Sequence, residues 1–166
     1  MNNKLNDKTK EYIIKLKDCL KVYKNKEVVL FCVGNYKVWF DCFGPTVAET
    51  LRRNNINCFI YGGFIFNVCA ININEYMCFI KQKHPDACII IVDNCISLKP
   101  YQNTEVVISK NKTIPACFTN MQPFGDISIL LKTHIYSDPF IFLEKQNEIV
   151  FNICESIKNV LLSVNL

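Results

Sequence analysis

The chain has 166 residues, of which half are hydrophobic and a fifth are charged, so it can bury one core and is not largely disordered. Its net charge of +4 comes from scattered lysines without a dense basic run, which argues against a nucleic-acid partner. No apolar stretch approaches the roughly 20 residues that cross a bilayer, and the polar start does not resemble a signal peptide. We therefore expect one cytoplasmic domain over residues 1–166, without a membrane partner.

Ten cysteines are spread through the chain, and none forms a CxxC pair. Zinc ribbons and redox motifs require close pairs, because two thiolates must reach one centre. Most of the cysteines lie inside apolar segments. We interpret them as small core side chains that a cytosol keeps reduced.

Hydrophobic periodicity and turn residues predict alternating helices and strands up to Val92. Helical spacing over residues 7–24 predicts an amphipathic helix that Asn6 or Asp7 caps. The elements predicted next are a strand at 28–33, a helix at 46–53, a strand at 57–61, a helix at 72–83 and a strand at 87–92. The first and last of these strands are continuous apolar segments, as expected of strands covered on both faces. The order βαβαβ predicts a mainly parallel sheet.

The pattern changes after Asp93. The predicted elements there are a loop at 94–104, a strand at 105–108, an irregular stretch at 111–125, a strand at 127–131 and a helix from 137 to about 163. Ser137-Asp138-Pro139 supplies a cap and a first-turn proline for that helix. We therefore predict an α/β fold, a three-layer α/β/α sandwich that includes an N-terminal helical segment (1–26) and a C-terminal helix (137–164).

Two carboxylates stand out by position. Asp93 directly follows the apolar strand 87–92, and Asp41 lies in the loop after strand 28–33. If these strands are neighbours, both side chains face the crevice beyond the carboxyl ends of the sheet. Such a pair supplies a general acid and a general base for amide hydrolysis, or two oxygen ligands for a divalent metal. We predict Asp41 and Asp93 as catalytic residues, although Asp41 could cap the next helix and Asp93-Asn94 could be turn residues.

Further site residues are expected beside these aspartates. We assign substrate binding to four polar and aromatic residues: Asn35, Trp39, Phe40 and Asn94. Trp39 and Phe40 would line the approach of a protein or peptide substrate. They could equally cover the sheet edge or a contact between copies in a homo-oligomer. No cofactor is expected, and a divalent metal stays open.

Nucleophilic catalysis is not supported by the sequence, because no serine or cysteine has a basic partner clearly aimed at it. Cys42 and Cys95 each follow one of the aspartates closely, so a thiol at the mouth of the site is conceivable. His84, at a helix end, is expected to face solvent, whereas His134 follows the last strand and could reach the crevice. The turn at Gly34 lacks both GxGxxG and GxxxxGK[ST], so no phosphate loop is predicted.

Residues 34–45 read GNYKVWFDCFGP, which resembles the GNxxVxxDxxGP segment of the spore germination protease. The apolar strand ending at Asp93 is similar to one found downstream in the same family. The smaller YyaC-type sporulation proteins, relatives of that protease, resemble the chain in length and in three more segments: Ile60–Gly63, Ala70–Ile73 and Phe124–Ile129. The hydrogenase maturation proteases are similar more distantly, through the GN…D…G loop and the VD strand end.

This resemblance implies a phosphorylase/hydrolase-like sandwich in which Asp41 and Asp93 match the proposed catalytic aspartates of the germination protease. It implies a sporulation- or germination-associated peptidase that hydrolyses small spore proteins. The chain departs from its relatives at Tyr36–Phe40, which replaces a polar loop, and at Cys69, which stands where they carry histidine. Two alternatives follow: an inactive relative that acts in binding or assembly, and a metal-dependent maturation endopeptidase with both aspartates as ligands.

Overall fold

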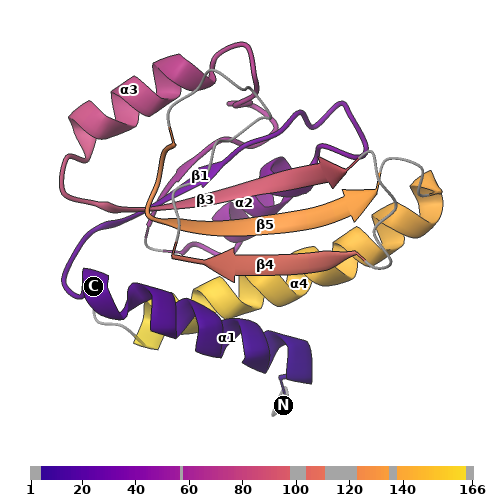
Figure 1. Ribbon diagram of the computed structural model, residues 1–166, viewed down its shortest axis with the longest axis horizontal. Coiled ribbons are helices and arrows are strands. Elements are labelled where there is room, and N and C mark those ends of the chain that lie inside the picture. Colours follow the sequence, from indigo (N-terminus) through magenta and orange to yellow (C-terminus); the bar gives the residue numbers. More distant parts are fainter. Residues whose placement is uncertain (1–4, 57, 98–103, 111–122, 135–137, 164–166) are drawn as a thin grey trace.

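A computed structural model describes residues 5–56, 58–97, 104–110, 123–134 and 138–163 (Figure 1). The elements are α1 (Asp7–Leu20), the 3₁₀ turn η1 (Lys21–Tyr23), β1 (Val28–Cys32), α2 (Phe43–Arg53), β2 (Phe59–Tyr61), α3 (Ile73–Lys83), β3 (Cys88–Ser97), β4 (Glu105–Ser109), β5 (Ile127–His134) and α4 (Pro139–Ser163). The predicted order of helices and strands is confirmed. Most of the irregular stretch predicted at 111–125 lies outside the described residues.

The described strands form one sheet in the order β2-β1-β3-β5-β4. β1 pairs in parallel with β2 and β3, β3 pairs in parallel with β5, and β4 runs antiparallel to β5. Figure 1 shows the arrows of β1, β3 and β5 pointing the same way and that of β4 opposing them. The predicted mainly parallel sheet is therefore confirmed, and β1 and β3 are direct neighbours, as the site prediction requires.

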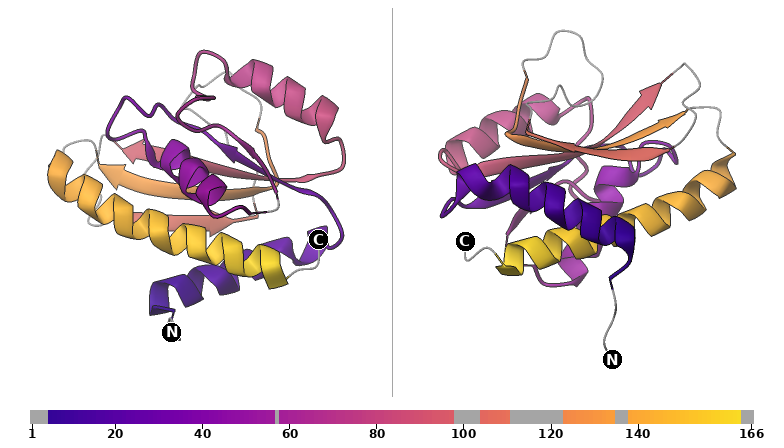
Figure 2. Two further views of the ribbon diagram at one scale, coloured as in Figure 1. Left: turned by 180° about the vertical axis from the view of Figure 1, so that it is seen from behind. Right: turned by 60° about the horizontal axis from the view of Figure 1, so that its bottom comes forward.

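Helices cover both faces of the sheet. On one face, Leu30 and Ile90 belong to a core cluster with residues of α1, α2 and α4. On the other face, Phe31 and Ile91 pack with residues of α3 such as Ile80. Figures 1 and 2 show α1 and α4 together below the sheet and α3 on the opposite side. The three-layer α/β/α architecture follows, and it explains why every residue of β1 is buried.

The connections around β1 create a switch point in this topology. After β1 the chain runs through α2 to β2, which pairs with one side of β1. It then runs through α3 to β3, which pairs with the other side of β1. The two helices therefore lie on opposite faces of the sheet. In open α/β sheets, ligands bind in the crevice that such a reversal leaves beyond the carboxyl ends of the strands.

Capping residues define several helix ends as predicted. The side chain of Asn6 accepts a hydrogen bond of 2.8 Å from Thr9 N at the start of α1. Asp138 Oδ1 accepts one of 2.9 Å from Phe140 N at the start of α4. Asn54 is the C-cap residue of α2, and Asn55 follows with a φ of 50°, in the left-handed region.

β3 is longer than predicted. It continues to Ser97, and its residues from Asp93 onward pair with β5 from Leu130 to His134. The predicted loop beginning at Asn94 is therefore wrong over residues 94–97. The polarity of Asp93 and Asn94 suggested a strand end, but the partner strand continues and supplies backbone hydrogen bonds to this stretch.

His84 is buried, with 5% of its surface exposed, so the expectation that it faces solvent is wrong. Its Nε2 lies 2.7 Å from the hydroxyl of Tyr61, and its Nδ1 hydrogen-bonds to the carboxylate of Glu27. The ring also packs on Phe59, with ring centroids 4.5 Å apart. These partners are distant in sequence, so the helix-end position of His84 gave no sign of them.

The cysteines with described side chains are free thiols. Five are buried, as their interpretation as core residues requires: Cys19, Cys32, Cys42, Cys88 and Cys154. Burial raises the pKa of both Cys88 and Cys154 to about 12, so these thiols are poor nucleophiles. Cys78 is exposed, and Cys117 lies outside the described residues. Among the described helices, none has the length and apolar character needed to span a membrane.

Candidate functional site

Two glycines let the chain leave β1 and return against the strand ends. Gly34 has a φ of 140°, and a Cβ atom there would lie 2.2 Å from the carbonyl oxygen of Asp41. A Cβ atom at Gly44 would lie 2.1 Å from Val33 O and 2.7 Å from Val92 O. Only glycine therefore lets the loop close on itself and the first turn of α2 rest on β1 and β3.

Asp41 closes this loop. Its Oδ2 accepts a hydrogen bond of 2.9 Å from Asn35 N, and its own backbone N donates to Val38 O over 2.9 Å. The N-cap residue of α2 is Cys42, which makes no side-chain capping bond, so the carboxylate of Asp41 turns to the loop instead. Burial raises the pKa of Asp41, and the hydrogen bond from Asn35 opposes that rise.

Asp93 lies within β3 and is 5% exposed. Its Oδ1 accepts a hydrogen bond of 2.7 Å from Asn94 N. Asn94 is also buried, and its Nδ2 donates to Phe40 O across the loop. Asn94 Oδ1 has no hydrogen-bond partner within the described ranges. The alternative that Asp93 and Asn94 are turn residues is wrong, because both are paired in the sheet.

A cavity of about 320 Å³ lies at this carboxyl edge of the sheet. Its polar walls come from Asn35, Asp41, Asp93 and Asn94, together with the thiol of Cys69. Its other described walls are apolar or glycine, and no lysine, arginine or histidine is among them. With Phe40, the cavity brings together every predicted site residue except Trp39.

Trp39 lies against α4 instead. Its ring packs edge-on against Phe142, with centroids 5.2 Å apart. Its carbonyl oxygen accepts a hydrogen bond of 3.2 Å from Cys42 Sγ, which in turn accepts one of 3.1 Å from Gln146 Nε2. Trp39 therefore anchors the loop on α4, and its assignment to substrate binding stays a prediction.

The second wall of the cavity comes from the loop before α3. Val68 O accepts a hydrogen bond of 2.9 Å from Gly34 N, which joins this loop to the first one. Asn72 Oδ1 accepts from Cys69 N, and Asn72 Nδ2 donates to Asn67 O, each over 2.9 Å. Cys69 and the following residues are thereby held beside the cavity. The sequence gave them no site role, since the segment carries no charged group.

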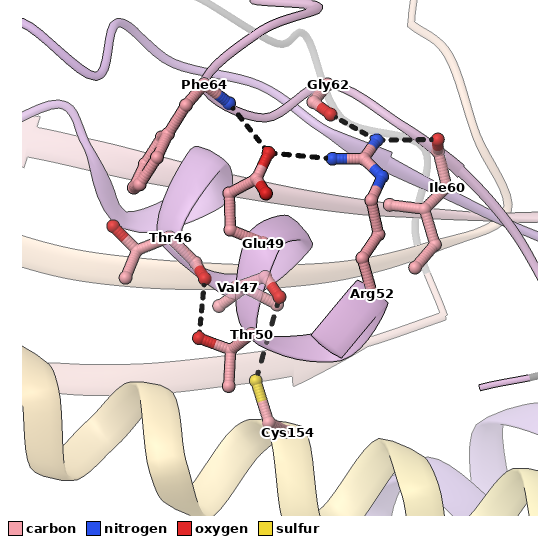
Figure 3. A network of polar contacts seen from close by, with 9 residues as sticks. All are labelled: Thr46, Val47, Glu49, Thr50, Arg52, Ile60, Gly62, Phe64 and Cys154. Atoms are coloured by element: carbon pink, nitrogen blue, oxygen red, sulfur yellow. Dashed lines mark hydrogen bonds and ion pairs between the residues drawn. The ribbon is translucent and has the colours of Figure 1, made fainter. Parts of the chain in front are cut away.

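A polar network between α2 and the turn after β2 holds the start of that loop (Figure 3). Arg52 donates from Nη2 to the carbonyl oxygens of Ile60 (3.0 Å) and Gly62 (2.5 Å). Its Nη1 pairs with Glu49 Oε1 at 3.0 Å, and that oxygen also accepts from Phe64 N at 3.0 Å. In sequence, Glu49 and Arg52 look like a surface ion pair, so this role was not predicted.

Two predictions stay open at this edge. The side chain of His134 is not among the described ones, so its reach toward the crevice is still a prediction. In the part of the chain that the structure describes, no group of three or more histidine, cysteine, aspartate or glutamate side chains could hold a metal ion.

The fold and the cavity define an α/β protein with two carboxylates at a topological switch point. The chain belongs to a family described as "Protein of unknown function (DUF1256)", whose model matches residues 1–160. No curated protein matches the sequence. The chain is similar to the crystal structure of a NiFe hydrogenase maturation protease, HycI from Thermococcus kodakarensis KOD1, with 16% identity and a TM-score of 0.45, over 83% of this chain and 97% of that one. This low similarity assigns no activity, so function is argued from the residues.

Proposed function

We propose that this chain is a peptidase that hydrolyses peptide bonds with the carboxyl groups of Asp41 and Asp93. One observation carries the proposal: both groups line the same cavity at the carboxyl edge of β1 and β3. A general acid and a general base must both reach one scissile bond, and a shared cavity is the first requirement for that.

The two aspartates take different roles in the proposed reaction. Burial raises the pKa of Asp41, and in this proposal Asp41 holds a proton in the resting site. Asp93 then takes a proton from the attacking water, and the resulting hydroxide adds to the scissile carbonyl carbon. Asp41 gives its proton to the leaving nitrogen as the C–N bond breaks. Asn94 Oδ1 accepts a hydrogen bond from a substrate N–H and orients the peptide.

The test is cleavage of small spore proteins by the purified chain, since the resemblance of residues 34–45 and 89–93 points to these substrates. Asp41→Asn and Asp93→Asn should each lower the rate by about 100-fold or more, the usual contribution of general acid–base catalysis. Asp86→Asn, at an exposed position, is the matched control and should leave the rate unchanged. Full activity in both site variants would refute the aspartate pair.

A metal-dependent form of the same reaction is a second candidate, because the cavity holds an uncommitted oxygen. Asn94 Oδ1 and the carboxylates of Asp41 and Asp93 are oxygen donors of the kind that hard divalent cations bind. Such an ion would supply a polarised carbonyl and a more acidic water. Titration with Mg²⁺ or Mn²⁺ should then raise the melting temperature of the wild type but not of Asp41→Asn.

A binding protein without hydrolytic activity is the other candidate, and the apolar walls of the cavity favour it. In that case the wild type would bind peptides and leave them intact under every metal condition. The cleavage assay therefore separates this candidate from both peptidase forms.

A further inference from the structure

Both loops that contribute walls to the cavity also carry exposed apolar side chains. Five of them form what we call the apolar rim: Tyr36, Phe64, Ile65, Phe66 and Ile71. Ile65 is 84% exposed and Ile71 is 94% exposed. Single exposed apolar residues are normal on a protein surface, but a group of them next to a concave site marks an interaction surface.

The rim is continuous with the cavity. The ring of Tyr36 on the first loop lies 5.6 Å from the ring of Phe64 on the second, measured between centroids. Ile71 belongs both to the rim and to the lining of the cavity. The rim therefore meets the cavity at Ile71.

Hydrogen bonds fix the start of the second loop, at Gly62 and Phe64. Phe64 N is bonded to Glu49, and Arg52 binds the carbonyl oxygen of Gly62 just before it (Figure 3). A Cβ atom at Gly62 would lie 1.9 Å from Cys32 O, so the turn is also packed tightly against β1. Fixed loops keep apolar side chains from collapsing onto the protein, and they reduce the entropy lost when a partner binds.

Charge restricts what can bind there. Residues 34–42 and 62–72 contain only two charged side chains, Lys37 and Asp41, and the cavity adds Asp93. Lys37 Nζ lies over the ring of Tyr36, 5.7 Å from its centroid, and is not part of the cavity wall. The two loops therefore suit apolar side chains, whereas a charged side chain would lose its hydration there with little compensation.

We propose that the rim and the cavity bind an extended peptide segment with apolar side chains and without charged ones. This inference names the substrate class of the proposed peptidase and rests on that function. The peptide's apolar side chains cover the rim, and Asn94 Oδ1 accepts one of its backbone N–H groups. A second copy of the chain is the weaker occupant, because a dimer through the rim would close the mouth of the cavity over Asp41 and Asp93.

The test measures binding without cleavage. In the Asp93→Asn background, which removes one catalytic group and keeps Asp41, a fluorescent peptide of alternating Leu and Ser should bind, as followed by fluorescence anisotropy. Ile65→Ser and Ile71→Ser should each weaken its binding by about tenfold, since each removes a buried aliphatic contact. Phe151→Ser on α4, which removes an exposed aromatic side chain outside the rim, is the matched control and should have no effect.

A second peptide tests the charge requirement. Replacing the Leu residues by Glu, or by Lys, should each abolish measurable binding, because a charged side chain loses its hydration on the apolar rim.

The outcomes separate this inference from the proposed function. Binding of the Leu peptide that depends on the rim, without cleavage by the wild type, supports the inference and refutes the peptidase. Cleavage without dependence on Ile65 or Ile71, equal binding of the Glu peptide, or no peptide binding overturns the inference. A dimer in sedimentation velocity that Ile65→Ser converts to a monomer also overturns it, because a second copy then covers the rim.

Discussion

The two edges of the sheet carry cavities of similar size and different chemistry. The carboxyl-edge cavity, about 320 Å³, has two carboxyl groups, an uncommitted amide oxygen and apolar walls. The cavity at the amino edge, about 270 Å³, is lined by charges of both signs: Lys26, Lys81, Asp86 and Asp126.

The charges at the amino edge already serve the fold. Asp126 Oδ2 accepts a hydrogen bond of 2.9 Å from Ile89 N, and Asp126 N donates to Ile89 O over 2.8 Å, which ties β3 to the start of β5. Lys81 lies over the ring of Phe124, 5.2 Å from its centroid. The comparison teaches that charge alone does not mark the site. Buried polar groups beside an apolar cavity do so, and they lie at the carboxyl edge.

The largest expected effect is at the carboxyl edge itself. Gly44→Ala should lower the free energy of unfolding by about 3 kcal/mol or more, because its Cβ would meet two strand-end carbonyl oxygens that cannot move independently. Urea unfolding measures this loss. Gly63→Ala is the control, since its Cβ would meet the side-chain ends of Arg52 and Glu49, which can shift. We expect a smaller loss there, about 1 kcal/mol from its positive φ. Equal losses would refute the packing argument.

A smaller effect is expected from the buried His84, whose partner Glu27 directly precedes β1 at the amino edge. His84→Ala removes both hydrogen bonds of the imidazole and should lower the free energy of unfolding by about 2 kcal/mol. Tyr61→Phe removes one of them and should lower it by about 1 kcal/mol. Peptide binding at the carboxyl edge should not change in either variant. A loss of binding that matches the loss of stability would show that the two edges are coupled.

The smallest effect is a dependence of stability on pH that Asp41 contributes. Because burial raises its pKa in the folded chain above the ordinary 3.8, folding favours the protonated form. Stability from this group is fully present below pH 3.8 and is lost as pH rises through the folded pKa. Asp41→Asn cannot ionise, so its stability relative to the wild type should rise over that interval and then level off. Urea unfolding between pH 3 and 7 measures this, and a constant difference would contradict it.

Much of the fold was predictable because the signals are local. Several helices and strands are determined by residues that are neighbours in the sequence. These residues are the apolar runs of β1 and β3, the glycine and proline of the loop after β1, and the side-chain caps of α1 and α4. The parallel order then places Asp41 and Asp93 at one edge. The length of β3 was not predictable in this way, because β5, more than thirty positions along the chain, supplies the hydrogen bonds that extend it.

The sequence by itself determined the α/β class, the order of the elements and the edge at which the two aspartates lie, since these follow from periodicity and short-range turns. Tertiary structure decided the rest: the burial of His84, the packing of Trp39 on α4, and the hydrogen bonds by which Glu49 and Arg52 fix the start of the loop after β2. Each depends on contacts between segments that are separated in the chain. The physical reason is that the burial of a side chain depends on how the layers pack. No local sequence pattern encodes which distant segment packs against a given residue.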